Sequence, residues 1–227
     1  MNIRGIIFDF NGVLVDDEPL HFKAFQKVLK EKGLKLSWKE YYENYLAYDD
    51  ENFFLNYFQD QNQSLEPEMI ASLTQSKSQK YFSMVGEKPP IINSTINFLD
   101  QLPPQIFLAI ASGAARNEIE FILTQIGILQ RFSTIIAAED VINGKPHPEG
   151  FQKALSGLQN HQPDLNASEV VGIEDSYRGI PSVKAAGMKC IATATTYSAD
   201  RLCEADLIID SFAGWTIDKL EMALIKP

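Results

Sequence analysis

The chain has 227 residues and a formal net charge of −10, and 45% of its residues are hydrophobic. This length and composition suit a globular protein with a full core, either as one large domain or as a core with a modest insertion. The acidic balance argues against nonspecific nucleic-acid binding, which needs clustered lysine and arginine. No apolar run reaches the roughly 18 residues of a membrane helix, so we expect no membrane span. We expect no secretory signal either, because Arg4 and Asp9 lie too close to the short apolar stretch between them.

The cysteines and histidines exclude two further kinds of site. Cys190 and Cys203 lack the CxxC spacing of redox motifs, and without secretory marks we expect reduced thiols in a cytoplasmic protein. The histidines are isolated from one another in the sequence, so a histidine-rich zinc site is not expected. They are His21, His147 and His161.

The first predicted elements are a strand and a block of helices. An apolar run over residues 5–8 predicts a buried strand that ends at Asp9, and Gly12 allows a sharp turn just beyond it. From about residue 18 to residue 90 the pattern is helical, with many aromatic residues and no convincing strand. The expected helices cover Leu20–Leu29, a segment opened by a capping box at Ser37–Glu40, Glu51–Phe58 and Pro67–Val85.

After the break at Pro89 and Pro90, amphipathic helices alternate with short apolar runs. Uninterrupted apolar strands between such helices are typical of a parallel sheet that is covered on both faces. The expected strands are Ile106–Ala111, Thr134–Ala137, Val170–Ile173, Lys189–Ala192 and Asp206–Ile209. We therefore predict an α/β fold with a Rossmann-like parallel sheet core, residues 1–16 and 91–227, and a small inserted helical domain, residues 17–90.

Polar residues follow several of the apolar runs, and in open α/β sheets ligands bind at the carboxyl ends of the strands. The first strand leads into an Asp-Phe-Asn-Gly turn, and the second leads into a Ser-Gly pair before a helix whose first N–H groups could hold an anion. Two prolines fix the approach of a lysine in a third loop. These loops carry Asp9 and Asn11, Ser112 and Gly113, Lys145, and Glu174 and Asp175. These loops would bring acids, a hydroxyl group and a lysine to the same edge of the sheet.

The same segments resemble the four motifs of the haloacid dehalogenase-like hydrolases. The matching segments are Asp9-Phe10-Asn11-Gly12-Val13, Ala111-Ser112-Gly113, Gly144-Lys145-Pro146 and Gly172-Ile173-Glu174-Asp175-Ser176. The helical block resembles the small cap of the β-phosphoglucomutase-like branch, and the hinge segment from Asp17 to His21 is similar to that branch as well. Each motif alone is weak, whereas four motifs in this order across nearly the whole chain are specific.

The resemblance implies a Mg²⁺-dependent phosphatase that acts on a small phosphorylated metabolite. It implies that Asp9 is the nucleophile and forms a phosphoaspartate, and that Ser112 and Lys145 bind the transferring phosphoryl group. The implied magnesium ligands are Asp9, Asp175, Glu174 and the backbone carbonyl of Asn11.

Elementary chemistry favours these roles. The negative charge of a phosphoryl group repels a carboxylate nucleophile, and a magnesium ion with a fixed lysine cancels that repulsion. Magnesium is a hard cation that prefers oxygen ligands, which carboxylates and a carbonyl supply. We also expect the positive charge of Lys145 to hold Asp9 ionised.

Three further residues are candidate substrate contacts. Gly113 follows the serine of the second motif, and His21 lies on the first helix of the helical block, where it could also be half-buried in packing. Lys77 resembles the cap lysine that contacts substrate phosphate in the mutase branch, although a solvated helix face accounts for it as well. The acids of residues 49–51 would repel a second phosphate, so a bisphosphorylated sugar is not expected.

Asn11 departs from the family's pattern. Most phosphatases and mutases of this family carry a second aspartate two residues beyond the nucleophile, which protonates the leaving oxygen and then deprotonates the attacking water. An amide side chain can do neither, and general acid–base catalysis is typically worth about 10²–10⁴-fold. The loss would fall mainly on sugar and alcohol phosphates, because acyl and aryl phosphates release stable anions.

Three explanations of Asn11 are open. Another group, His21 or Glu18 of the helical block, could supply the proton. The chain could be slow, or could have become a binding protein for a phosphorylated ligand. Asn11 could also be a substitution for aspartate or be partly deamidated, since Asn-Gly sequences deamidate readily.

A phosphomutase or phosphonatase-like relative is a further alternative. The mutase cycle needs acid and base action at two hydroxyl groups, and phosphonate cleavage needs a cap lysine that forms a Schiff base. Both requirements make these activities less favoured than phosphatase activity. We expect a monomer or a weak dimer.

Overall fold

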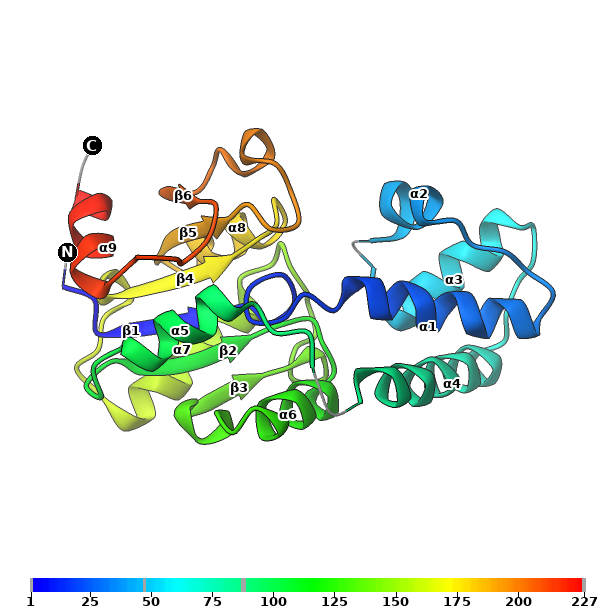
Figure 1. Cartoon of the computed structure of the whole chain (residues 1–227), viewed down its shortest axis with the longest axis horizontal. Helices are drawn as coiled ribbons and strands as arrows, with labels where there is room; N and C mark the ends of the chain where they lie inside the picture. Colours follow the sequence, from blue (N-terminus) through cyan, green and yellow to red (C-terminus); the bar gives the residue numbers. More distant parts are fainter. Residues whose placement is uncertain (1, 47, 87–88, 226–227) are drawn as a thin grey trace. The chain divides into compact units, whose positions relative to one another are not determined.

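A computed structural model describes residues 2–46, 48–86 and 89–225 of the chain (Figure 1). The chain divides into two compact units, one made of residues 1–16 with 90–227 and the other of residues 17–89. Within the described ranges, no helix combines the length and the apolar character needed to cross a membrane. Cys190 is buried and Cys203 is exposed, and both are free thiols.

A parallel sheet forms the centre of the first unit, with the strand order β3-β2-β1-β4-β5-β6. Each pair of neighbouring strands is parallel, and β1 and β4 are buried along their whole length, as expected for central strands covered on both faces. The strands are β1 (Gly5–Phe8), β2 (Phe107–Ala111), β3 (Thr134–Ile136), β4 (Val170–Glu174), β5 (Lys189–Thr193) and β6 (Leu207–Ile209). The predicted α/β fold is confirmed.

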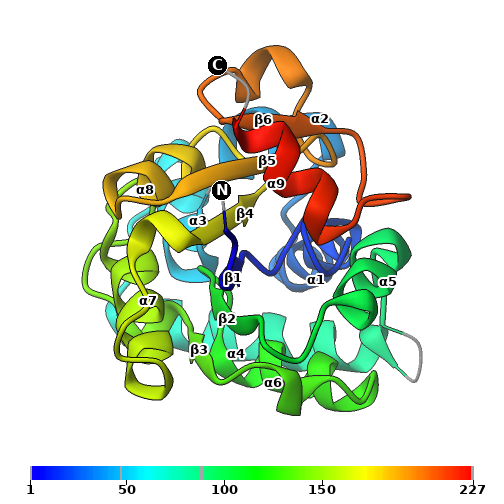
Figure 2. The same ribbon diagram turned by 90° about the vertical axis from the view of Figure 1, so that its left-hand side faces the viewer.

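Helices cover both faces of this sheet. The helices are α5 (Asn93–Gln101), α6 (Arg116–Gln125), α7 (Glu149–His161), α8 (Gly179–Ala185) and α9 (Ile217–Ile225). Figure 2 shows α7 and α8 on one face and α5 and α9 on the other. The layers pack closely, since a Cβ added at Gly172 of β4 would lie 2.6 Å from the side chain of Val183 on α8.

The strand register brings the loops of the predicted site to one edge. Phe8 at the end of β1 is paired with Ile110 of β2 on one side and with Ile173 of β4 on the other. The residue after Phe8 is Asp9, and the residue after Ile173 is Glu174. Acids that are far apart in the sequence therefore emerge side by side at the carboxyl ends of the central strands.

The second unit is helical. Its helices are α1 (Glu18–Glu31), α2 (Trp38–Glu40), the π-helical turn η1 (Tyr41–Tyr45), α3 (Asp50–Asp60) and α4 (Pro67–Val85). The predicted capping box opens α2: Ser37 Oγ accepts a hydrogen bond from Glu40 N at 3.2 Å, and Glu40 Oε2 accepts one from Ser37 N at 3.4 Å. Gly33 ends the α1 segment with a φ of +74°, in the left-handed region that favours glycine.

An aromatic core holds the helical unit together. The rings of Phe25 and Phe53 stack with centroids 3.8 Å apart, and Tyr45 and Tyr57 pack edge to face against each other at 5.7 Å. Most of the aromatic residues of this block are buried, whereas Tyr42 is 40% exposed. Because aromatic rings bury a large apolar area, a unit of this size can form a core of its own.

Candidate active site

The turn after β1 positions the first candidate residue. Asp9 ends the strand, and the turn from Phe10 to Val15 is closed by a hydrogen bond that Gly12 N donates to Val15 O at 2.7 Å. Gly12 has a φ of +74°, and a Cβ at this position would lie 1.9 Å from Oδ2 of Asp175. Two separate constraints therefore require glycine at position 12, namely the backbone conformation and the approach of an acid from β4.

Comparing Gly12→Ala with Gly127→Ala should separate the cost of the backbone conformation from the cost of the clash with Asp175. Gly127 has the same φ of +74° but nothing within 4 Å of an added Cβ. Gly127→Ala should therefore show only the backbone cost of about 1–2 kcal/mol. Gly12→Ala should lower the free energy of unfolding by a further 1–3 kcal/mol or so through the clash with Asp175. Urea unfolding measures both values, and equal losses would contradict the packing argument.

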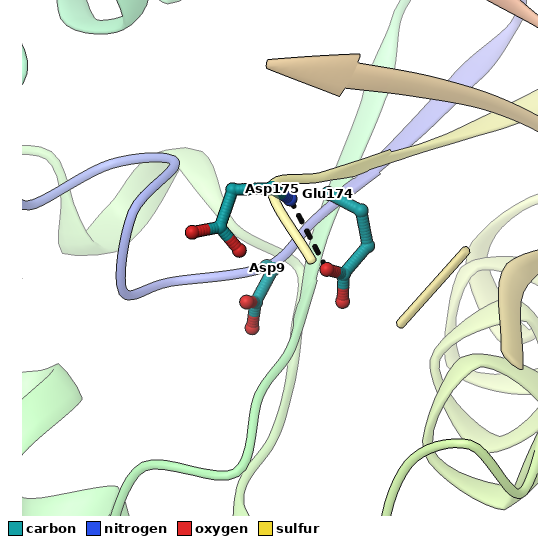
Figure 3. Close-up of side chains that lie close together, drawn as sticks. All are labelled: Asp9, Glu174 and Asp175. Carbon is teal, nitrogen blue, oxygen red and sulfur yellow. Dashed lines mark hydrogen bonds between the residues drawn. The ribbon is translucent and has the colours of Figure 1, made fainter. Parts of the chain in front are cut away.

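Three buried carboxylates and one lysine meet beside this turn. One oxygen from each of Asp9, Glu174 and Asp175 lies within 4.8 Å of the others. Figure 3 shows that Asp9 extends from the end of β1 and that the other two extend from the end of β4. Lys145 Nζ, from the loop between β3 and α7, lies 2.8 Å from Asp9 Oδ1 and 2.5 Å from Glu174 Oε1. Four residues predicted from the sequence therefore lie together in the structure.

Glu174 is engaged through both of its oxygens. Its Oε2 accepts hydrogen bonds from Asp175 N at 3.1 Å, which is the dashed line in Figure 3, from Ser176 N at 3.2 Å and from Ser176 Oγ at 2.9 Å. Its Oε1 contacts Lys145, and a Cβ added at Gly179 would lie 1.8 Å from the same oxygen. Glu174 thus contacts both the lysine and the Asp175 loop, and it still offers an oxygen to the same cluster as Asp9 and Asp175.

Burial and crowding set the charges of this cluster. Burial raises the pKa of Asp9 to about 6, since it outweighs the lowering by Lys145, and Glu174 adds to the rise. Burial, followed by Glu174 and Asp9, raises the pKa of Asp175 well above its usual range. Burial lowers the pKa of Lys145, but Asp9 and Glu174 together outweigh burial and leave this pKa above its usual value. The lysine thus favours an ionised Asp9, as expected, but burial has the larger effect.

The donor set fits a hard divalent cation. The three carboxylates are buried, they offer only oxygen ligands, and a single ammonium group opposes their charge. A divalent cation would relieve the crowding that raises the pKa values of Asp9 and Asp175. Magnesium accepts such oxygen ligands and usually retains several waters, so two carboxylates and a carbonyl suffice for it.

Ser112, Gly113 and Asn11 lie on loops at the same edge of the sheet. Ser112 follows β2 directly, is 7% exposed, and its Oγ accepts a hydrogen bond from Ala114 N at 3.1 Å. Nothing lies within 4 Å of a Cβ added at Gly113, so a ligand could approach the backbone there. Asn11 is partly exposed in the turn two residues beyond Asp9.

Lys77 is buried, so its interpretation as part of a solvated helix face is wrong. Its side chain is fully buried, and Nζ lies 2.8 Å from Asp50 Oδ1 and 2.6 Å from His21 Nδ1. The ammonium group also lies over the rings of Phe25 and Tyr81, at 5.1 Å and 5.2 Å from the centroids. Contacts with a carboxylate, an imidazole and two aromatic faces replace the hydration that this ammonium group loses on burial.

These contacts define the tautomer of His21. An ammonium group can only donate, so Nδ1 of His21 accepts from Lys77 and the ring proton lies on Nε2. Nε2 is 3.1 Å from Asp17 Oδ2, and the ring stacks on Tyr81 with centroids 4.3 Å apart. His21 is therefore neutral in this arrangement, and donation of a proton from Nδ1 would require Lys77 to move away.

The acidic segment of residues 49–51, at the start of α3, serves the structure of the helical unit. Asp49 Oδ1 accepts a hydrogen bond from Asn52 N at 2.8 Å and caps α3, while Asp50 forms the ion pair with Lys77. Two of the three acids that were expected to repel a second phosphate are thus engaged within their own unit. Their effect on a ligand is correspondingly smaller than the sequence alone indicates.

The Lys77–Asp50 pair should behave as a buried ion pair in a double-mutant cycle. Asp50→Asn leaves the ammonium group buried beside a neutral partner, so it should lower the free energy of unfolding by about 2–3 kcal/mol. Adding Lys77→Met should recover most of this loss, as measured by urea unfolding followed by circular dichroism. The control is the exposed pair Lys39–Glu43, 3.9 Å apart, where Glu43→Gln should cost less than about 0.5 kcal/mol. Strictly additive losses at positions 50 and 77 would contradict the coupling.

The threonines that follow β5 are a part of this site that was not predicted from the sequence. Thr195 Oγ1 donates a hydrogen bond to Gly12 O at 2.5 Å, and Thr193 Oγ1 donates one to Glu174 O at 3.3 Å. The sequence pattern could have predicted these threonines, because they follow the apolar run of residues 189–192 just as the other site residues follow their apolar runs.

Comparisons with known proteins identify the family and the fold. The model of the haloacid dehalogenase-like hydrolase family matches residues 6–193. The validoxylamine A 7′-phosphate phosphatase of Streptomyces hygroscopicus subsp. limoneus is 34% identical over 119 residues, which are 52% of this chain and 54% of that enzyme. A crystal structure of a CbbY variant from Rhodobacter sphaeroides, in complex with xylulose-(1,5)-bisphosphate, is 25% identical with a TM-score of 0.85. That similarity covers 96% of this chain and 99% of CbbY.

The β-phosphoglucomutase of Clostridium difficile has the same fold. Its crystal structure superposes with a TM-score of 0.83 at 23% identity and covers 98% of this chain and 97% of the mutase. The resemblance to the mutase branch is therefore confirmed for the fold, and the predicted phosphatase class agrees with the name of the Streptomyces relative.

Proposed function

This chain belongs to the haloacid dehalogenase-like hydrolase family, and we propose that it is a Mg²⁺-dependent phosphatase of a small phosphorylated metabolite. The observation that carries the proposal is the buried cluster at the ends of β1 and β4. There Lys145 Nζ lies 2.8 Å from the candidate nucleophile Asp9, and the carboxylate of Asp175 lies beside them. The candidate nucleophile and cation ligands thus lie at the ends of β1 and β4, and the candidate phosphate-binding lysine reaches them from the loop between β3 and α7.

Asp9 would act as the nucleophile. One of its carboxylate oxygens forms a bond to phosphorus while the bond between phosphorus and the leaving oxygen breaks, which gives a phosphoaspartate. Water then attacks phosphorus, the aspartyl bond breaks and inorganic phosphate leaves. Magnesium, held by Asp9, Asp175 and the backbone carbonyl of Asn11, would supply positive charge against the phosphoryl oxygens. Lys145 and Ser112 would bind the same oxygens, and Gly113 would let them approach the backbone.

Asn11 limits which groups can supply a proton to the leaving oxygen. A sugar or alcohol leaving oxygen needs a proton as it departs, and an amide side chain cannot give one. The proton must then come from water or from a group of the helical unit, where Glu18 and His21 are the candidates. Burial raises the pKa of Glu18, which favours the protonated form that could donate to the leaving oxygen. An acyl or aryl leaving group departs as a stable anion and avoids this difficulty.

The helical unit, residues 17–89, would serve as the cap that selects the substrate, with His21 and Lys77 as the predicted contacts. Phosphorylated carbohydrates are the first class to test, because a CbbY variant binds xylulose-(1,5)-bisphosphate. The acids of residues 49–51 would still disfavour a second phosphate, although the contacts of Asp49 and Asp50 within their own unit reduce this effect.

A substrate panel with and without magnesium tests the proposal. With Mg²⁺ the protein should hydrolyse p-nitrophenyl phosphate and acetyl phosphate, and it should hydrolyse sugar monophosphates more slowly. Removing the metal with a chelator should abolish these rates, and added Mg²⁺ should restore them. Hydrolysis rates that do not change when the chelator is added would contradict the assigned metal site.

The second candidate function is binding of a phosphorylated metabolite without efficient turnover, which Asn11 favours. A binder would show no hydrolysis above background for any of these substrates. It would still gain thermal stability when phosphate and Mg²⁺ are added together, because a ligand that binds only the folded state stabilises it.

A further inference from the structure

A fifth loop contacts the site in addition to the four predicted from the sequence. Thr193, Thr195 and Thr196 lie at and just after the end of β5, which pairs with β4 so that Ala192 is opposite Glu174. Since parallel neighbours end at the same edge, this threonine loop comes against the acid-bearing end of β4.

Two threonines bind backbone carbonyls of the site. Thr195 Oγ1 donates to Gly12 O at 2.5 Å and so connects residues 183 positions apart in the sequence. Thr193 Oγ1 donates to Glu174 O at 3.3 Å and lies 3.3 Å from Thr195 Oγ1. The loop therefore links the turn that follows the nucleophile to the strand that carries the other acids.

Thr196 contacts a candidate metal ligand. Its hydroxyl group forms a hydrogen bond with the carboxylate of Asp175. The same hydroxyl oxygen lies 2.8 Å from the position that a Cβ of Gly12 would occupy, whereas Asp175 Oδ2 lies 1.9 Å from that position. The hydroxyl, the carboxylate and the glycine turn thus converge on one point, and only the missing side chain at position 12 makes room for them.

A cation–π cluster ties the threonine loop to the loop after Asp175. The guanidinium carbon of Arg201 lies 4.4 Å from the ring centroid of Tyr177 and 4.8 Å from that of Tyr197. The two rings pack edge to face at 5.2 Å, and Tyr197 directly follows Thr196. Such contacts restrict both loops to one arrangement, so the threonine hydroxyls are presented from a fixed backbone.

We propose that Thr196, with a smaller contribution from Thr195, is a positioning residue for the metal site. Thr196 aims the Asp175 carboxylate, and Thr195 fixes the turn after Asp9 through Gly12 O. The inference rests on the proposed function, since it assigns these hydroxyl groups to a magnesium site. A ligand that is already oriented loses less freedom when a cation binds, and partners of this kind typically change metal affinity by about 10–100-fold.

Metal titration of the full chain tests the inference without relying on turnover. Isothermal titration with Mg²⁺ should give about tenfold weaker binding for Thr196→Val, which keeps the shape but removes the hydroxyl group. Thr196→Ser should stay within about threefold of the wild type, because it keeps the hydrogen bond. Thr195→Val should lose only about twofold to threefold, since its hydrogen bond is exposed. Thr124→Val, at an exposed position on α6, is the matched control and should bind as the wild type does.

Kinetics on p-nitrophenyl phosphate give a second readout. For Thr196→Val the Mg²⁺ concentration that gives half of the full rate should rise about tenfold, while kcat at saturating Mg²⁺ should fall much less. A merely structural defect would instead lower the folded fraction and kcat at every Mg²⁺ concentration. If the valine variant melts early, Thr196→Ala repeats the test without adding a methyl group to the site.

The outcomes separate this inference from the proposed function. Wild-type binding of Mg²⁺ with unchanged affinity in Thr196→Val overturns the positioning role and leaves the phosphatase proposal standing. Equal losses in Thr196→Val and Thr196→Ser also overturn it, because packing and not the hydroxyl group would then be responsible. Absence of Mg²⁺ binding by the wild type overturns the proposed metal site and this inference with it.

Discussion

Replacing Asp9 with alanine is expected to reduce hydrolysis of p-nitrophenyl phosphate and acetyl phosphate by about 10⁴-fold or more. The substitution removes both the proposed attacking oxygen and a proposed metal ligand. Loss of a catalytic nucleophile commonly lowers kcat by several orders of magnitude. Steady-state rates at saturating Mg²⁺ give the measurement, and the control is Asp100→Ala, which removes an exposed carboxylate from α5 and should leave the rates unchanged.

A trapping experiment distinguishes a covalent role for Asp9 from an electrostatic one. Acid-quenched wild-type protein should carry phosphate from radiolabelled acetyl phosphate in a linkage that hydroxylamine cleaves, whereas Asp9→Asn should carry none. A labelled Asp9→Asn protein, or an Asp9→Ala protein with a substantial residual rate, would assign the nucleophile to another group.

Replacing Asn11 with aspartate is expected to raise hydrolysis of sugar phosphates by at least about tenfold. The new carboxyl group could protonate the leaving oxygen and then take the proton of the attacking water. Acetyl phosphate should gain less, because its leaving group departs without a proton. The measurement is kcat/KM for both substrates, and the ratio between the two gains is the decisive quantity.

The comparison needs a control for charge. Asn160→Asp adds the same negative charge at an exposed position on α7 and should leave kcat/KM unchanged for both substrates. If Asn11→Asp gives no gain on sugar phosphates, another donor already operates. Glu18→Gln and His21→Ala should then reveal it by a loss confined to the sugar phosphates.

The fold was readily predicted from the sequence because each strand is a short apolar run between polar turns. The predicted bounds of β1 match the structure, and those of the other strands differ from it by one residue at most. The capping box at Ser37 and the proline at the start of α4 likewise gave helix starts that agree with the structure. These signals are local, and the parallel arrangement follows from their order along the chain.

Contacts between distant residues could not be predicted in the same way. Lys77 is charged and lies on an amphipathic helix, so nothing local indicates that it is buried against Asp50 and His21. Glu174 was predicted from its place after β4, but its contact with Lys145, from the loop between β3 and α7, has no local signal. In both cases the partner lies on another element, and side-chain packing decides the outcome.

The separate aromatic core of the helical unit bears on how such enzymes diverge. Residues 17–89 bury rings such as Phe25, Phe53 and Tyr57 against one another, so this core is built without Asp9, Lys145 or Asp175. Substitutions on the surface of this insert can accumulate without cost to the chemistry at the strand ends. Under the proposed function, in which this insert selects the substrate, a new preference would be accessible through the insert alone, and exchanging the insert between relatives would transfer selectivity.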